Sequence, residues 1–127
     1  GLYLASMNTG AARNNFAEPL TQTKDRMPYT LKQGMLGFSL VDFLLSFALP
    51  YPNHIKIDVD GNEAKICAGA QRTLADPQVK SIMVEIFELR GGAYIPSQLS
   101  ALGFQLGKVV EVTPGHAEVL NHFFFRQ

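Results

Sequence analysis

The sequence predicts an α/β domain with a mixed sheet, mostly parallel with an antiparallel last strand, and with helices on both faces. Three observations lead to this fold class. Residues 54–87 read as strand, helix and strand, residues 79–87 are apolar on both faces, and the last two strands are joined by only a turn. A strand–helix–strand succession forms a parallel pair, and strands joined by a turn pair antiparallel. A strand that is apolar on both faces lies in a sheet covered by helices on both sides.

Composition is that of a globular domain. The chain has 127 residues, of which 46% are hydrophobic and 17% are charged, which excludes disorder of the whole chain. Eleven basic residues balance eleven acidic ones, so a nucleic-acid partner is not expected. Cys67 stands alone, and the longest apolar run is shorter than a membrane span. We therefore expect no disulfide, no membrane partner and a cytoplasmic location, and we interpret Gly1 as a cleavage scar or a cut boundary.

The chain begins with a loop-like part. Residues 2–6 are a short apolar run that favours a strand, but Asn, Gly, Pro and Thr give residues 7–25 the character of a loop. We interpret residues 1–35 as an N-terminal arm or loop and residues 36–127 as the α/β part of a single domain. Ser39 predicts the start of a helix with Leu40, Phe43, Leu44 and Phe47 on one face, ended by Pro50.

The remaining elements are predicted by apolar periodicity and turn residues. Alternation predicts a strand over 54–59, and Asp60 stands three residues before Glu63, the spacing of a capping box that opens a helix. The buried stripe of that helix consists of Ile66, Cys67, Ala70 and Leu74. Strands are predicted over 79–87, 104–112 and 122–126, with a short helix over 96–102 before the second of them.

One block carries a resemblance to a known family. Residues 52–63 read PNHIKIDVDGNE, a G-A step and a T-L step stand at 69–70 and 73–74, and residues 79–86 read VKSIMVEI. This succession resembles the central signature of the FkbM family of S-adenosylmethionine-dependent methyltransferases. Residues 14–18 (NNFAE) and 121–126 (NHFFFR) resemble two further motifs of that family. The resemblance implies a Rossmann-like methyltransferase fold that transfers a methyl group from S-adenosylmethionine to a hydroxyl of a small molecule or sugar.

The family's glycine-rich cofactor turn has no counterpart here, because no Gly-x-Gly occurs in the 127 residues. The chain therefore resembles the C-terminal part of the fold, with strands four to seven and without the strands that hold the adenosine and ribose. We interpret it as a truncated, partial Rossmann-like methyltransferase fold, for which S-adenosylmethionine is the implied cofactor. Binding of the cofactor by this chain alone is not expected.

Candidate site residues gather where the first parallel strand ends, because ligands of α/β sheets bind at the carboxyl ends of strands. Asp58 and Asp60 are the candidate catalytic residues, with Asp60 preferred as the base for a hydroxyl. Asp58 and Gly61 are assigned to the cofactor. The candidate substrate-binding residues are Glu63, Glu85, Asn15 and Glu18.

Structural interpretations stand beside these assignments. Asp60 and Glu63 could cap the next helix, and Glu85 could pair with Lys56 on the neighbouring strand. Cys67 on an apolar stripe is interpreted as core. A calcium loop is rejected, because Glu63 stands where the sharp turn needs glycine, and the scattered histidines do not predict zinc.

Two functional hypotheses remain. The first is an O-methyltransferase, or its acceptor side, acting on a small-molecule hydroxyl. The second is a non-catalytic module, because loss of the preceding strands would leave residues 54–59 as an exposed edge that pairs with another chain. This second hypothesis predicts a homodimer, formed either by two such edges or by residues 2–6 adding a strand to a neighbour.

Overall fold

The computed structural model describes residues 2–4, 15–16, 26, 28–87, 92–115 and 118–126. It divides into two compact units, Gly1–Gly37 and Phe38–Gln127. The first unit contains three short strands, β1 (Leu2–Leu4), β2 (Asn15–Phe16) and β3 (Leu31–Gln33). They form an antiparallel sheet in the order β2-β1-β3, so part of the predicted arm has sheet structure.

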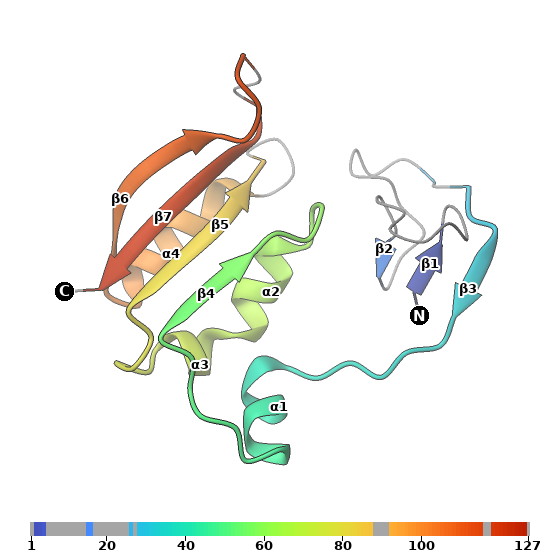
Figure 1. Cartoon of the computed structure of the whole chain (residues 1–127), viewed down its shortest axis with the longest axis horizontal. Coiled ribbons are helices and arrows are strands. Elements are labelled where there is room, and N and C mark those ends of the chain that lie inside the picture. Colours follow the sequence, from blue (N-terminus) through green and yellow to red (C-terminus); the bar gives the residue numbers. More distant parts are fainter. Residues whose placement is uncertain are drawn as a thin grey trace. The chain divides into compact units, whose positions relative to one another are not determined.

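The second unit contains a four-stranded mixed sheet in the order β4-β5-β7-β6 (Figure 1). Its strands are β4 (His54–Ile57), β5 (Ser81–Ile86), β6 (Phe104–Glu111) and β7 (Leu120–Arg126). The expected βαβ unit is confirmed, since β4 and β5 are parallel, and the last two strands pair antiparallel as predicted. The fold class is therefore α/β.

The prediction of a mostly parallel sheet is wrong. Only β4–β5 is a parallel pair, whereas β7 lies between β5 and β6 and is antiparallel to both. The cause is the β6–β7 hairpin. Its return strand β7 pairs with β5, so β6 is displaced to the edge of the sheet, although it runs in the same direction as β4 and β5.

The helices of the second unit are short. They are α1 (Leu40–Ser46), α2 (Glu63–Gly69), α3 (Gln71–Leu74) and α4 (Ile95–Ala101), the last preceded by a 3₁₀ turn, η2 (Gly92–Tyr94). The predicted Ser39 cap is confirmed, because the Ser39 side chain accepts a hydrogen bond from the Asp42 amide at 3.2 Å. The predicted apolar face of α1 is wrong in part, since Val41 and Leu44 are buried whereas Phe43 and Phe47 are exposed.

For the described residues of the second unit, the prediction of helices on both faces of the sheet is also wrong. Helices α2, α3 and α4 lie on the same side of the sheet (Figure 1). We call this side the core face; it carries Ile82, Val84 and Ile86 of β5, all buried. The opposite side, the open face, carries Ser81, Met83 and Glu85. Met83 is the one apolar side chain among these three, so β5 alternates as a strand with a helix layer on one face does.

An apolar core holds the second unit together between the core face and the three helices. Its buried members are Ile57, Cys67, Ala70, Leu74, Val79, Ile82, Val84, Ile86, Ile95, Leu99, Phe104 and Phe124. The predicted stripe of the second helix is confirmed at Cys67, Ala70 and Leu74, whereas Ile66 is 39% exposed. The helix itself is interrupted at Ala70, which ends α2 and begins α3.

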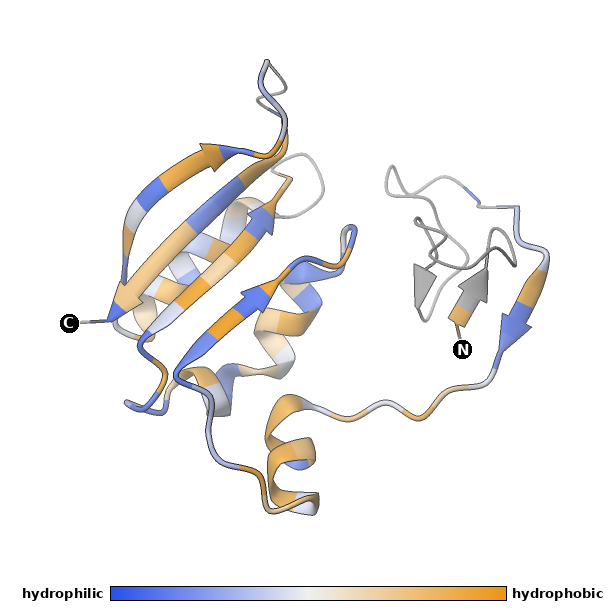
Figure 2. Ribbon diagram, in the orientation of Figure 1, coloured by the Kyte–Doolittle hydropathy of each residue, from blue (hydrophilic) through white to orange (hydrophobic). Residues whose placement is uncertain are grey.

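Many large apolar side chains between residues 31 and 49 are exposed. Leu36 is 88% exposed and Leu45 is 64% exposed, and Figure 2 shows α1 in apolar colours over most of its length. Phe38, Phe43 and Phe47 contact one another edge-on or tilted, with ring centroids 5.0–6.0 Å apart. No helix in the described residues has the length and apolar character needed to cross a bilayer.

Candidate functional site

The segment that joins β4 to α2 forms a tight loop at the carboxyl end of β4. Asp60 and Gly61 both have positive φ angles, 56° and 108°. Asp tolerates this left-handed region better than most residues, and glycine adopts it freely. The backbone therefore reverses within two residues, which keeps Asp58, Asp60 and Glu63 close to the strand end.

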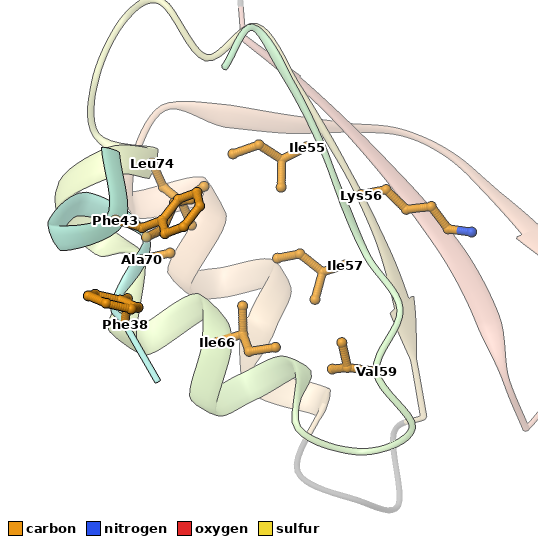
Figure 3. A pocket seen from close by; sticks show the side chains of 10 residues that line it. Phe38, Phe43, Ile55, Lys56, Ile57, Val59, Ile66, Ala70 and Leu74 are labelled. Atoms are coloured by element: carbon orange, nitrogen blue, oxygen red, sulfur yellow. The ribbon is translucent and has the colours of Figure 1, made fainter. Parts of the chain in front are cut away.

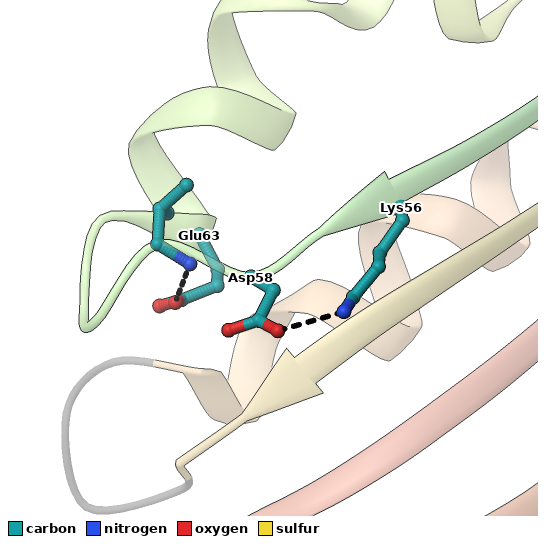
Figure 4. Close-up of polar contacts among 4 residues, drawn as sticks. Lys56, Asp58 and Glu63 are labelled. Carbon is teal, nitrogen blue, oxygen red and sulfur yellow. Dashed lines mark hydrogen bonds and ion pairs between the residues drawn. The ribbon is translucent and has the colours of Figure 1, made fainter. Parts of the chain in front are cut away.

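Glu63 closes the loop from the helix side. It is 7% exposed, and its Oε1 accepts hydrogen bonds from the Val59 amide at 3.2 Å and the Gly61 amide at 3.0 Å. Figure 4 shows the Glu63 carboxylate beside the end of β4, with one of these two hydrogen bonds drawn. The predicted capping box is wrong in detail, because Asn62 is the N-cap of α2 and makes no side-chain capping bond. Glu63 instead stabilises the loop by accepting its amides.

Lys56 and Asp58 form an ion pair on the open face, with Nζ and Oδ2 3.0 Å apart (Figure 4). The predicted pairing of Lys56 with Glu85 is wrong, since the carboxylate that Lys56 contacts is Asp58. The register explains this: Lys56 lies beside Met83 on β5, and Glu85 is two residues further along the strand. Asp58 follows β4 directly and stands two residues after Lys56, so the two side chains extend to the same side of the chain.

Glu85 lies half-buried near the end of β5, beside the β4–α2 loop. Burial raises the pKa of its carboxyl, and the negative charges of Asp58, Glu63 and Asp60 raise it further, while Lys56 lowers it. The carboxylates of Asp58, Asp60, Glu63 and Glu85 thus influence one another at the carboxyl ends of two parallel strands. We call them the carboxylate cluster.

Two candidate substrate-binding residues are not brought to this cluster. Asn15 lies in β2 of the first unit, where it pairs with Tyr3 of β1. Glu18 lies outside the described residues. The structure therefore gathers the candidates Asp58, Asp60, Gly61, Glu63 and Glu85, all of which belong to the second unit.

The contacts of the cysteine and histidine side chains described in the second unit indicate structural roles. Cys67 is buried on α2, as expected for a core residue, and burial raises the pKa of its thiol to about 11, with Glu63 adding to the effect. His54 Nδ1 lies 2.8 Å from the Ser81 hydroxyl oxygen, and His122 is buried against Phe124. Within the described ranges, no three His, Cys, Asp or Glu side chains are placed to hold a metal ion.

An apolar groove of about 440 Å³ runs beside β4 on the core face (Figure 3). Side chains of β4 and the adjoining loop line one wall, those of α2 and α3 form the floor, and aromatic rings from the start of the α1 segment form the other wall. These lining side chains include Ile55, Ile57, Val59, Ile66, Leu74 and Phe43.

Sequence reasoning missed this groove. The available signal was the large number of apolar side chains in residues 31–49, many of which are not buried by the predicted elements. Comparison of the chain with models of protein families, with curated proteins and with solved structures found no match. A function for the chain is therefore inferred from its geometry and its motifs.

Proposed function

We propose that the chain forms the acceptor side of an S-adenosylmethionine-dependent O-methyltransferase that acts on a hydroxyl of a small molecule or sugar. The observation that supports this proposal best is the carboxylate cluster at the carboxyl ends of β4 and β5. Ligands of α/β sheets bind at this end of the strands. Methylation of a hydroxyl needs a group that takes its proton, and a carboxylate can do so.

Within the proposed site, the residues divide by their contacts. Glu63 uses Oε1 to hold the Val59 and Gly61 amides, so its role is to position the loop. Asp60 lies at the turn of that loop and is the preferred base, with Asp58 beside it. Glu85 has a raised pKa and holds a proton in less acidic solution than an ordinary glutamate does, which suits a side chain that contacts the acceptor hydroxyl.

S-adenosylmethionine would supply an activated methyl group on a positively charged sulfur. The cluster fits that positive charge, since four carboxylates outweigh the charge of the neighbouring Lys56 and attract a cation. Asp58 and Gly61 would lie closest to the amino-acid end of the cofactor. The described residues offer no glycine-rich turn for the nucleoside, so the chain's own contribution is to position the hydroxyl, attract the cation and accept the proton.

The test compares S-adenosylmethionine with S-adenosylhomocysteine, which lacks the positive charge on sulfur, by amide chemical-shift mapping of the full chain. Because the chain lacks the turn that holds the nucleoside, we expect weak binding that is seen only at high ligand concentration, with shifts confined to residues 58–63 and 85 and larger for the ligand with the charged sulfur. Asp58→Asn with Asp60→Asn should remove the difference between the two ligands. Glu111→Gln is the control, because it removes a carboxylate charge outside the cluster; Glu111 accepts a hydrogen bond from the Gly115 amide at 3.0 Å. Equal shifts from the two ligands, or shifts elsewhere, would contradict the proposal.

A further inference from the structure

Strand β4 is an edge of the four-stranded sheet, since it pairs with β5 on one side and with no other strand among the described residues of the second unit. The Asn53 carbonyl accepts hydrogen bonds from the Lys80 and Ser81 amides at 2.7 and 3.2 Å, so the backbone of Asn53 faces β5. Backbone groups alternate sides along a strand. Those of His54 and Lys56 therefore face the free edge of β4. The same alternation, continued by one step beyond Ile57, brings those of Asp58 to this edge, where the three residues can pair with a further strand.

The side chains along this edge alternate in type and change in charge at one point. The sequence from residue 54 to residue 60 reads H-I-K-I-D-V-D. Apolar side chains stand at 55, 57 and 59, basic ones precede Ile57, and acidic ones come after it. Reversing the segment about Ile57 therefore places Lys56 opposite Asp58, whereas Asp60, with its positive φ angle, lies in the loop beyond the paired residues.

This pattern selects one register for two antiparallel copies of the segment. When the two copies are centred on Ile57, Lys56 lies opposite Asp58 of the second copy, and Ile55 lies opposite Val59 of the second copy. Centring on Lys56 would place two lysines opposite each other, and centring on Asp58 would place two aspartates opposite each other. Opposite charges across a strand pair stabilise it and like charges destabilise it.

The Ile57-centred register also satisfies the backbone. Lys56 and Asp58 both face the free edge, so these two residues form hydrogen-bonded pairs on either side of the symmetry axis. Ile57 then forms the non-hydrogen-bonded pair at the axis. The apolar side chains of the second copy would point to the core face, where the groove beside β4 is lined by Ile55, Ile57 and Val59.

We propose that two copies of this chain pair antiparallel through residues 54–59, in the register centred on Ile57, to form a continuous sheet. This inference goes beyond methyl transfer and does not depend on it. Within each copy Lys56 already contacts Asp58 at 3.0 Å, so pairing creates a cluster of four alternating charges on the open face. Each copy thereby places its Lys56 beside the Asp58 of the other.

The first test is a charge-exchange experiment on the full chain, read by analytical ultracentrifugation. Lys56→Asp alone and Asp58→Lys alone each replace two attractive contacts by two repulsive ones, so each should raise the dimer Kd by about tenfold or more. The double variant should return close to the wild-type Kd. Both side chains are well exposed, so each variant should keep the wild-type circular dichroism spectrum.

The double variant restores the ion pair within each chain as well as the contacts between chains. A mixture of the two single variants restores only the contacts between chains, so it distinguishes the two effects. Neither single variant retains the ion pair within its own chain, yet in the mixed dimer two acids of one copy face two bases of the other. We therefore expect the mixture to form a dimer more tightly than either variant alone. A mixture that stays as weak as its components would overturn the proposal.

The second test fixes the register by oxidation. Ile57→Cys should form a covalent dimer, because a non-hydrogen-bonded antiparallel pair has its Cα atoms about 4.5 Å apart, within the range of a disulfide. Ile55→Cys is the matched control on the same face of β4, since its two copies would be offset by about 13 Å along the strands. Wild-type chain, with Cys67 buried, should not cross-link.

Three results would overturn the inference. The first is a wild-type chain that stays monomeric at all accessible concentrations, as it would if a segment of the same chain occupied the edge. The second is a dimer whose Kd is unchanged by either charge variant. The third is cross-linking through Ile55→Cys in preference to Ile57→Cys, which would show a different register.

Discussion

Arg126, at the end of β7, is a half-buried side chain whose removal should destabilise the second unit. Its guanidinium donates to the backbone carbonyls of Leu74, Asp76 and Leu102 at 2.7, 2.6 and 2.7 Å, and lies over the Phe104 ring at 4.3 Å. Two of these carbonyls belong to the end of α3 and the turn after it, and the third lies just beyond α4. One side chain thus joins the last strand to the ends of two helices.

Arg126→Met keeps an apolar stem of similar length but removes all these hydrogen bonds. A hydrogen bond to a charged group contributes about 1.5–3 kcal/mol, but partial exposure and shared carbonyl surroundings make the three bonds non-additive. We therefore expect the free energy of unfolding to fall by about 3 kcal/mol. Arg126→Lys should lose less, about 1–2 kcal/mol, because an ammonium group keeps the charge but lacks the planar fork that reaches several carbonyls.

The assay is urea denaturation at one low protein concentration, followed by circular dichroism. Lys108→Met is the control, since Lys108 also lies over an aromatic ring, that of Phe123 at 4.8 Å, but on the open face. Its loss should stay below about 1 kcal/mol. If Arg126→Met lost no more than Lys108→Met, the assignment of Arg126 as the link between β7 and the helix ends would be refuted.

Three further substitutions or conditions test other parts of the second unit by the same assay. The pKa of the Cys67 thiol is raised from 9.0 to about 11, so the folded chain binds this proton more tightly than the unfolded chain does. The free energy of unfolding should therefore fall by about 3 kcal/mol as the pH rises from below 9 through 11. Cys67→Ala should show a smaller fall over the same pH range, and an equal fall would refute the assignment. Gly61→Ala should lose about 1 kcal/mol, because φ is 108° although nothing obstructs a Cβ there; a neutral effect would show that the loop relaxes. Gly107→Ala should lose about 1 kcal/mol, since its Cβ would lie 2.6 Å from a Phe125 ring carbon that can move outward; a loss above about 3 kcal/mol would show that the ring is fixed.

Local patterns in the sequence predicted most elements of the second unit but not their assembly. Ser39 capped α1, the alternation of Ile55 and Ile57 predicted β4, and the brief turn predicted the β6–β7 hairpin. What failed was the prediction that most strand pairs are parallel. Whether β6 or β7 pairs with β5 depends on which strand buries its side chains better over the helices, and periodicity within one strand carries no information about this.

The candidate site was predictable where it depended on strand ends. Asp58, Asp60 and Glu85 lie where the carboxyl ends of β4 and β5 meet, as the βαβ pattern indicates. The partner of Lys56 was not predictable from residue types alone, because it depends on which strand neighbour lies within reach. The role of Glu63 depends on the positive φ angles of the loop, which place two amides within reach of its carboxylate.

The most direct test of the proposed site is the pH titration of the Glu85 side-chain carboxyl, followed by carbon NMR. We predict a midpoint above that of an ordinary glutamate in the free chain, because burial and the neighbouring carboxylates raise its pKa. At ligand concentrations high enough to overcome the weak binding expected of this chain alone, S-adenosylmethionine should lower that midpoint, since a positive sulfur beside the cluster favours the ionised carboxylate. S-adenosylhomocysteine, whose sulfur is neutral, should lower it less. An ordinary midpoint in the free chain, or one that responds equally to both ligands, would contradict the assignment of the carboxylate cluster as the site of a cationic methyl donor.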